Sequence, residues 1–301
     1  MKENCMSKNI LITGKNGYLG TSFKQYIEQK NSSLPSKDRW NLTFVSVKDD
    51  AWREQSFAEC DVILHAAGIV HRKEEPGMEQ LYYEVNTNLT RELAEKYKEE
   101  RLAAGKAAQF VFLSTMSVYG KVTGQITGQT VPAPVNFYGK SKLDAEKALQ
   151  EMQNEAFTVS IVRPPMIYGR TCTGNYRLLE KLARKLPVFP KTKNERSMLY
   201  IENLCEFLRL LMEKEAAGVF CPQNREYVNT SEMVAAIRKS YGKAGATIPG
   251  FGWLLQFLAG KITLFSKVFG SLTYERSMSE YPMLGDYQIV NFGESINGSK
   301  E

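Results

Sequence analysis

The sequence is short of the residues on which several enzyme classes depend. Its 301 residues include two histidines, His65 and His71, and five scattered cysteines without a CxxC spacing. Histidine-based metal catalysis and Ser-His-Asp hydrolysis are therefore disfavoured, and no metal site is expected. The scattered cysteines are typical of a reducing compartment. The N-terminal stretch MKENCMSKN lacks the apolar run of a secretory signal, so we expect a cytoplasmic protein.

Long apolar runs and strong charge bias are also scarce. One segment, residues 251 to 270, is rich in Leu, Phe and Trp, but Lys261 and Lys267 interrupt it. It is a poor membrane-spanning helix, and a buried or partner-facing helix pair is favoured over an interfacial membrane helix. Basic residues exceed acidic ones by 39 to 33 without a long basic run. This balance disfavours nucleic acid as a partner and suits an anionic small molecule.

Apolar strands and amphipathic helices alternate through the first half of the chain. Each strand–helix–strand unit forces its two strands to be parallel, so the pattern predicts an α/β fold with a doubly wound parallel sheet. The predicted strands are 9–13, 42–47, 61–65, 109–114 and 158–162, and the predicted helices are 18–29, 52–58, 78–100 and 137–152.

The pattern loosens after Pro164 and Pro165, which predicts a second, smaller region. We expect residues 1–169 to form the main α/β domain, with 199–222 returning to it. Residues 170–198 and 223–301 are expected to form a substrate-binding domain.

A glycine-rich loop, ITGKNGYLG, joins the first predicted strand to the first helix. Gly14 permits a tight turn, Gly17 allows close approach of a pyrophosphate, and Gly20 allows the helix to pack on the strand. The free N–H groups of the helix N-terminus favour an anion at this place. The context favours dinucleotide binding over an ordinary turn, although the spacing is GxxGxxG rather than GxGxxG.

Two further motifs contain residues suited to proton transfer. In YGKSK, Tyr138 and Lys142 stand one helical turn apart on one face, where an ammonium would lower the pKa of the phenol. Such a tyrosine can act as a general base or acid. In STMSVYG, hydroxyl residues including Thr115 follow the preceding strand. A surface Tyr–Lys pair and a hydroxyl-capped strand end are the alternatives.

Taken together and in this order, the motifs resemble those of the extended short-chain dehydrogenase/reductase family. The motifs are the glycine loop, LHAAG (64–68), STMSVYG, YGKSK and RPPMIYG (163–169), and the resemblance covers most of residues 9–210. Within this family they are similar to the nucleotide-sugar epimerases, reductases and dehydratases. The resemblance implies a Rossmann domain, a C-terminal nucleotide-sugar domain, and NAD or NADP as the cofactor.

The resemblance also implies roles for individual residues. Thr115, Tyr138 and Lys142 match the catalytic set, and Lys142 also matches the residue that holds the nicotinamide ribose. Asn86 matches a family asparagine that is either structural or catalytic. Arg196 in ERSMLYIENL matches an arginine that clamps the nucleotide diphosphate, and Asn175 is a weaker candidate for substrate contact. The residues implied in cofactor binding are Gly14, Gly17, Tyr18, Leu19, Gly20, Lys48, His65, Ala66, Ala67, Tyr138, Lys142 and Pro164, and Tyr168 lies in the segment implied to run along the nicotinamide.

The sequence departs from the family pattern at two places. The second strand ends in VSVKDD, where Ser46 and Lys48 precede the acids, and Lys48 could meet a 2′-phosphate. NAD and NADP therefore both stay open. Dehydratases of the family have an Asp and a Glu where this chain has Met116 and Ser117, so a dehydratase is disfavoured.

The resemblance therefore predicts an NAD(P)-dependent nucleotide-sugar 4-epimerase in the synthesis of surface polysaccharide precursors. A UDP- or dTDP-sugar is the expected substrate, and a homodimer is the expected assembly. An NAD(P)H-dependent reductase of a nucleotide-4-keto-6-deoxy sugar is one alternative. A non-catalytic dinucleotide-binding sensor is another, which the intact Thr115, Tyr138 and Lys142 set disfavours.

Overall fold

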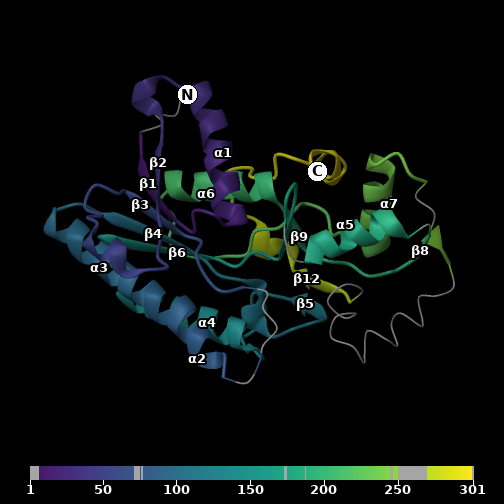
Figure 1. Cartoon of the computed structure of the whole chain (residues 1–301), viewed down its shortest axis with the longest axis horizontal. Coiled ribbons are helices and arrows are strands. Elements are labelled where there is room, and N and C mark those ends of the chain that lie inside the picture. The colour runs from purple at the N-terminus through teal and green to yellow at the C-terminus, as the bar shows by residue number, and fades with distance from the viewer. Residues whose placement is uncertain are drawn as a thin grey trace.

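A six-stranded parallel sheet forms the centre of the molecule (Figure 1). The computed structural model describes residues 7–70, 75, 77–172, 175–186, 188–244, 247–249 and 270–299. The strands follow the order β10-β6-β4-β3-β1-β2, and every neighbouring pair is parallel. They are β1 (Asn9–Thr13), β2 (Asn41–Val45), β3 (Val62–His65), β4 (Ala108–Leu113), β6 (Phe157–Val162) and β10 (Gly218–Phe220). The predicted doubly wound α/β fold is confirmed.

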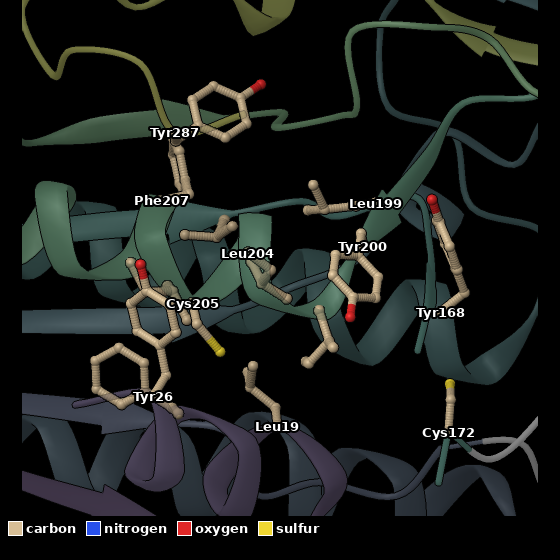
Figure 2. Packing of buried hydrophobic residues seen from close by; sticks show 14 of the residues in the cluster. Leu19, Tyr26, Tyr168, Cys172, Leu199, Tyr200, Leu204, Cys205, Phe207 and Tyr287 are labelled. Carbon is tan, nitrogen blue, oxygen red and sulfur yellow. The ribbon is translucent and has the colours of Figure 1, made fainter. Parts of the chain in front are cut away.

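Helices cover both faces of this sheet, and each face has its own apolar cluster. In β1, Ile10 and Ile12 face one cluster while Leu11 faces the other, as the period of two in a strand requires. Figure 2 shows part of the first cluster, where Leu19 and Tyr26 approach Leu204 and Cys205. The covering helices are α1 (Tyr18–Ser32) and α6 (Ile201–Glu213) on one face, and α2 (Glu79–Tyr83), α3 (Leu89–Ala103) and α4 (Phe137–Met152) on the other.

Several predicted elements differ from the structure in their details. The helix predicted over 78–100 is divided, because a five-residue π-helical segment, Glu84–Asn88, separates α2 from α3. The helix predicted over 52–58 is instead a short 3-10 helix, Asp50–Glu54. The strand predicted over 42–47 ends at Val45. The helix predicted over 137–152 matches α4.

A smaller region is built beyond the carboxyl ends of the strands. Its described residues form three two-stranded parallel ladders, β11–β8, β12–β5 and β7–β9, together with three helices. The elements are β5 (Gly124–Ile126), β7 (Met166–Tyr168), β8 (Phe189–Pro190), β9 (Met198–Tyr200), β11 (Thr247–Ile248), β12 (Leu272–Tyr274), α5 (Asn175–Lys185), α7 (Thr230–Ser240) and α10 (Phe292–Gly298).

The two strands between residues 199 and 222, the segment expected to return to the first domain, pair in different ladders. β10 pairs with β6 at the edge of the main sheet. The strand near 199 is β9, which pairs with β7 in a separate ladder. α6 lies between them and packs against α1.

The apolar segment 251–270 lies outside the described residues, except for Gly270. The prediction of a helix pair there stays a prediction. In the described part of the chain, no helix combines the length and the apolar character needed to cross a membrane.

Candidate active site at the carboxyl edge of the sheet

The glycine loop leads from β1 into α1 in a conformation that leaves room for an anion. Gly14 has φ +86°, and Gly17 N–H donates to the Gly14 carbonyl over 2.7 Å, which closes the turn. A Cβ on Gly14 would lie 3.3 Å from the Ala67 backbone nitrogen, so a side chain there would crowd the neighbouring loop. No side chain caps the N-terminus of α1. This geometry fits a pyrophosphate.

The loop after β3 is held by a buried threonine–histidine pair. Thr13 Oγ1 accepts the N–H groups of Ala66 and Ala67, each over 3.1 Å, and contacts His65 Nδ1 over 2.9 Å. His65 Nε2 contacts Thr90 Oγ1 over 2.9 Å. Burial lowers the pKa of His65 to about 3, with a further contribution from the charge of Lys142. The imidazole is therefore neutral at physiological pH.

The side chain of His65 is fully buried, and the place of His65 in a cofactor-binding loop stays a prediction. It lies beneath the loop and positions Ala66 and Ala67. The side chains of Tyr18 and Leu19 likewise pack with the core, so only their backbone groups can serve a phosphate. The Tyr168 hydroxyl is buried between Ser295 Oγ and Asn224 Nδ2, so its side chain belongs to the core rather than to a cofactor surface.

Thr115 and Tyr138 meet because two chain segments pack unusually closely. Thr115 follows β4 and accepts the N–H of Ser117 over 3.1 Å, which begins the 3-10 helix Met116–Tyr119. A Cβ on Gly139 of α4 would lie 2.7 Å from the Ser117 carbonyl oxygen, so only glycine permits this approach. As a result, the side chain of Thr115 hydrogen-bonds the Tyr138 phenol.

The protonation of Tyr138 differs from the expectation. Burial raises the pKa of Tyr138 to about 12, and the hydrogen bond from Thr115 opposes this only in part. Lys142, on the same helix face, directs its ammonium to the Leu113 carbonyl oxygen over 2.9 Å. The predicted lowering of the phenol pKa by Lys142 is therefore wrong for this arrangement.

Lys142 is buried between the end of β4 and the loop after β3. Its Nζ lies 4.3 Å from the centroid of the Phe112 ring, and a Cβ on Gly68 would approach it to 3.4 Å. Burial lowers the pKa of Lys142 to about 7, while Glu146 acts in the opposite direction. Lys142 can therefore change its charge near neutral pH.

Asn86 has a positioning role that the sequence left undecided. Its Oδ1 accepts the Ile69 N–H over 2.8 Å, and its Nδ2 donates to Ser141 Oγ over 3.0 Å. The side chain is fully buried. Asn86 therefore ties the loop after β3 to α4, next to Lys142.

A buried ion pair beneath the site was missed at the sequence level. Arg163 donates to both carboxylate oxygens of Glu146, and its Nη1 donates to the Tyr119 hydroxyl over 2.8 Å. Ser114 Oγ also donates to Glu146. The signal was present in the sequence, since Glu146 stands one turn after Lys142 and Arg163 directly follows β6.

The remaining candidates are Arg196, Asn175 and Pro164. Arg196 is 9% exposed, its Nη1 donates to the Gly270 carbonyl over 2.7 Å, and burial lowers its pKa to about 10. Its Nε has no hydrogen-bond partner among the described residues. Asn175 begins α5. Pro164 is buried, and its carbonyl accepts the Met116 N–H over 3.0 Å.

Both acidic residues that follow β2 already have hydrogen-bond or ion-pair partners within the protein. Asp49 accepts the Ala51 N–H over 3.2 Å, and Asp50 pairs with Arg53 over 2.9 Å. Lys48 is exposed just before them. These commitments agree with the departure from the family pattern noted in the sequence.

Comparison with known proteins decides the family. The model of the NAD dependent epimerase/dehydratase family matches residues 10–221. The chain belongs to this family.

Two curated relatives are 4-epimerases. UDP-glucose 4-epimerase of Vibrio cholerae is 29% identical over 287 residues, covering 88% of this chain and 83% of that protein. N-acetyl-alpha-D-glucosaminyl-diphospho-ditrans,octacis-undecaprenol 4-epimerase of Escherichia coli O157:H7 is 28% identical over 256 residues, covering 79% and 74%.

A solved structure agrees with this membership at the level of the fold. UDP-glucuronic acid 4-epimerase from Bacillus cereus, in complex with NAD, superposes with a TM-score of 0.71 at 18% identity, covering 97% of this chain and 94% of that one. The predictions of family, of an enzyme, and of NAD or NADP as the cofactor are confirmed.

We expect that removing one partner of the Glu146–Arg163 pair lowers the free energy of unfolding far more than replacing both partners with apolar residues. Glu146→Leu leaves a buried guanidinium unpaired, so the free energy of unfolding should fall by about 3–5 kcal/mol. The double variant Glu146→Leu/Arg163→Met should lie closer to the wild type, because no buried charge is left. Urea denaturation measures both, and a double variant less stable than the single one would contradict this account.

We also expect Lys142 to make stability depend on pH. In nucleotide-free protein, folded Lys142 releases its proton near pH 7, while the unfolded chain keeps it to about pH 10.5. The unfolded state then binds more protons between these values, so the free energy of unfolding should rise with pH, by at least about 1 kcal/mol relative to Lys142→Met. Denaturation of both proteins from pH 6 to about 10 tests this. Parallel pH profiles would contradict it.

Proposed function

We propose that this protein is a nucleotide-sugar 4-epimerase that uses Tyr138 as its acid–base residue. The observation that carries the proposal is the hydrogen bond between Thr115 and the Tyr138 phenol, with the Lys142 ammonium one helical turn away. A general base needs to be within hydrogen-bond reach of the proton that it removes. A sugar hydroxyl placed between Thr115 and Tyr138 would satisfy this condition.

In this reaction Tyr138, Thr115 and Lys142 would each have a separate role. A bound nicotinamide supplies the hydride acceptor and donor. Tyr138 takes the proton from the 4-hydroxyl of the sugar and later returns it, while Thr115 holds the same oxygen. If Lys142 turns from the Leu113 carbonyl toward the phenol when a nicotinamide ribose is present, its charge lowers the phenol pKa.

The smaller region would hold the nucleotide. Arg196 supports this role, because its Nε is buried and has no hydrogen-bond partner in the described part of the chain. A guanidinium is matched in shape to the oxygens of a diphosphate. The region contacts the site through Tyr274, whose hydroxyl donates to the Arg163 carbonyl, and the Tyr274 N–H donates to Ser197 Oγ, next to Arg196. We assign residues 170–198 and 223–301 to this region, with Asn175 as a further contact.

One observation favours a second candidate, an NADPH-dependent reductase of a 4-keto sugar. Lys48 is the uncommitted charge after β2, and a lysine there suits a 2′-phosphate. The two functions differ in their coenzyme requirement. Activity without added coenzyme, with NAD released on denaturation, supports the epimerase, whereas a strict need for NADPH supports the reductase.

Tyr138→Phe tests the proposal most simply. Removing the phenol hydroxyl should reduce turnover of the active UDP- or dTDP-sugar by about 10²–10⁴-fold, because the proton of the 4-hydroxyl then loses its proposed acceptor. Tyr83→Phe is the matched control, since Tyr83 hydrogen-bonds Asp144 and should leave turnover unchanged. If Tyr138→Phe stays within a few-fold of the wild type, Tyr138 is not the base.

A further inference from the structure

The excess of basic over acidic residues in the chain is concentrated in one short segment. Residues 170–193 contain seven lysines and arginines and a single acid, Glu180. The net charge of this segment therefore equals the formal net charge of the whole protein, +6. The carboxylate of Glu180 is buried and accepts the Tyr241 hydroxyl over 2.6 Å, so it leaves the cations of the surface uncompensated.

Helix α5 presents most of these cations on one side. Tyr176, Leu179 and Ala183 are buried against the rest of the protein. The exposed positions of the opposite side are all basic and recur at helical spacing: Arg177, Lys181, Arg184 and Lys185. A stripe of this composition is a cationic surface rather than a mixed, salt-bridged one.

The end of α7 and the β8–β11 ladder extend this surface. Lys243 donates to the Arg184 carbonyl over 2.6 Å, and the Arg184 guanidinium lies 5.0 Å from the centroid of the Tyr241 ring. The Lys191 N–H donates to the Ile248 carbonyl over 3.0 Å. Figure 1 shows α5, α7 and β8 together at one end of the molecule. The single exposed acid of α7, Glu232, lies in its first turn, away from Lys243.

Large apolar side chains are exposed among these cations. Leu186 is 38% exposed, Val188 39% and Ile248 37%. Leu186 directly follows α5, Val188 directly precedes β8, and Ile248 pairs with Pro190 of β8. We define the basic face by its exposed members: Arg177, Lys181, Arg184, Lys185, Leu186, Val188, Lys191, Lys239, Lys243 and Ile248.

We propose that the basic face docks on the anionic surface of a lipid bilayer. Lysines and arginines are attracted by acidic headgroups, and exposed Leu, Val and Ile side chains can enter the membrane interface. A nucleic acid would interact with the cations but would not bury these apolar side chains. At the sequence level a membrane was disfavoured for residues 251–270. The basic face lies on other segments, because α5, α7 and β8 come together only in the fold. The docking does not depend on the chemistry proposed for Tyr138.

Vesicle sedimentation of the full-length protein tests the docking. The wild type should bind vesicles of equal parts phosphatidylcholine and phosphatidylglycerol, and not vesicles of phosphatidylcholine alone. Binding should weaken at high salt because exposed charges are screened. The triple variant Arg177→Gln/Lys181→Gln/Lys185→Gln should lose about 100-fold in partition coefficient, at roughly five-fold for each cation.

Matched variants separate this surface from general charge. Lys30→Gln/Lys37→Gln/Lys147→Gln removes three exposed cations elsewhere and should bind within about two-fold of the wild type. Leu186→Ser/Ile248→Ser should weaken binding without removing charge. Circular dichroism and turnover of a soluble nucleotide-sugar check that each variant is folded.

Three results would overturn the proposal. The wild type could bind neutral and acidic vesicles equally or not at all. The two triple variants could bind alike. A single-stranded RNA could bind more tightly than acidic vesicles at the same salt and lose this binding in the first triple variant, which would make the basic face a nucleic-acid surface.

Discussion

The buried pair of Glu146 and Arg163 is the contact on which the arrangement of the site depends. It joins α4 to the end of β6, and Ser114 adds the end of β4 to the same carboxylate. Because a charge without its partner is costly in the interior, the pair favours the relative position of these three elements in which both charges are paired. Thr115 follows Ser114, and Lys142 and Tyr138 precede Glu146 by one and two turns, so the candidate catalytic residues lie on the elements that this contact joins.

The backbone of Arg163 links the site to the smaller region. The Arg163 carbonyl accepts the Tyr274 hydroxyl, and Ser197 accepts the Tyr274 N–H next to Arg196. Arg196, proposed to bind the nucleotide, is thus connected by two hydrogen bonds and the backbone to the end of β6, which the Glu146–Arg163 pair joins to α4. Burial disfavours the charged forms of Lys142 and Tyr138, because it lowers the pKa of the amine and raises the pKa of the phenol. The free protein therefore holds Tyr138 as a phenol rather than a phenolate.

The sequence was most informative where the signal is local. The period of α4 and the alternation of strands predicted the parallel sheet and placed Tyr138 and Lys142 on one helix face. Contacts between distant segments were not predictable: Gly124 pairs with Leu272, and Tyr168 turns into the core to meet Ser295. The roles of His65 and Asn86 also depend on such contacts. Neither residue type indicates whether its side chain faces a ligand or a neighbouring loop.

The most direct test follows a hydride at C4 of the sugar. The protein is incubated, without added coenzyme, with a UDP- or dTDP-sugar that carries deuterium at C4, and the epimeric product is examined by mass spectrometry and NMR. The account predicts that the label stays at C4 in the product and that no hydrogen from solvent enters that position. Loss of the label to solvent during conversion would show that the carbon-bound hydrogen leaves as a proton, and would contradict hydride transfer with Tyr138 acting on the hydroxyl.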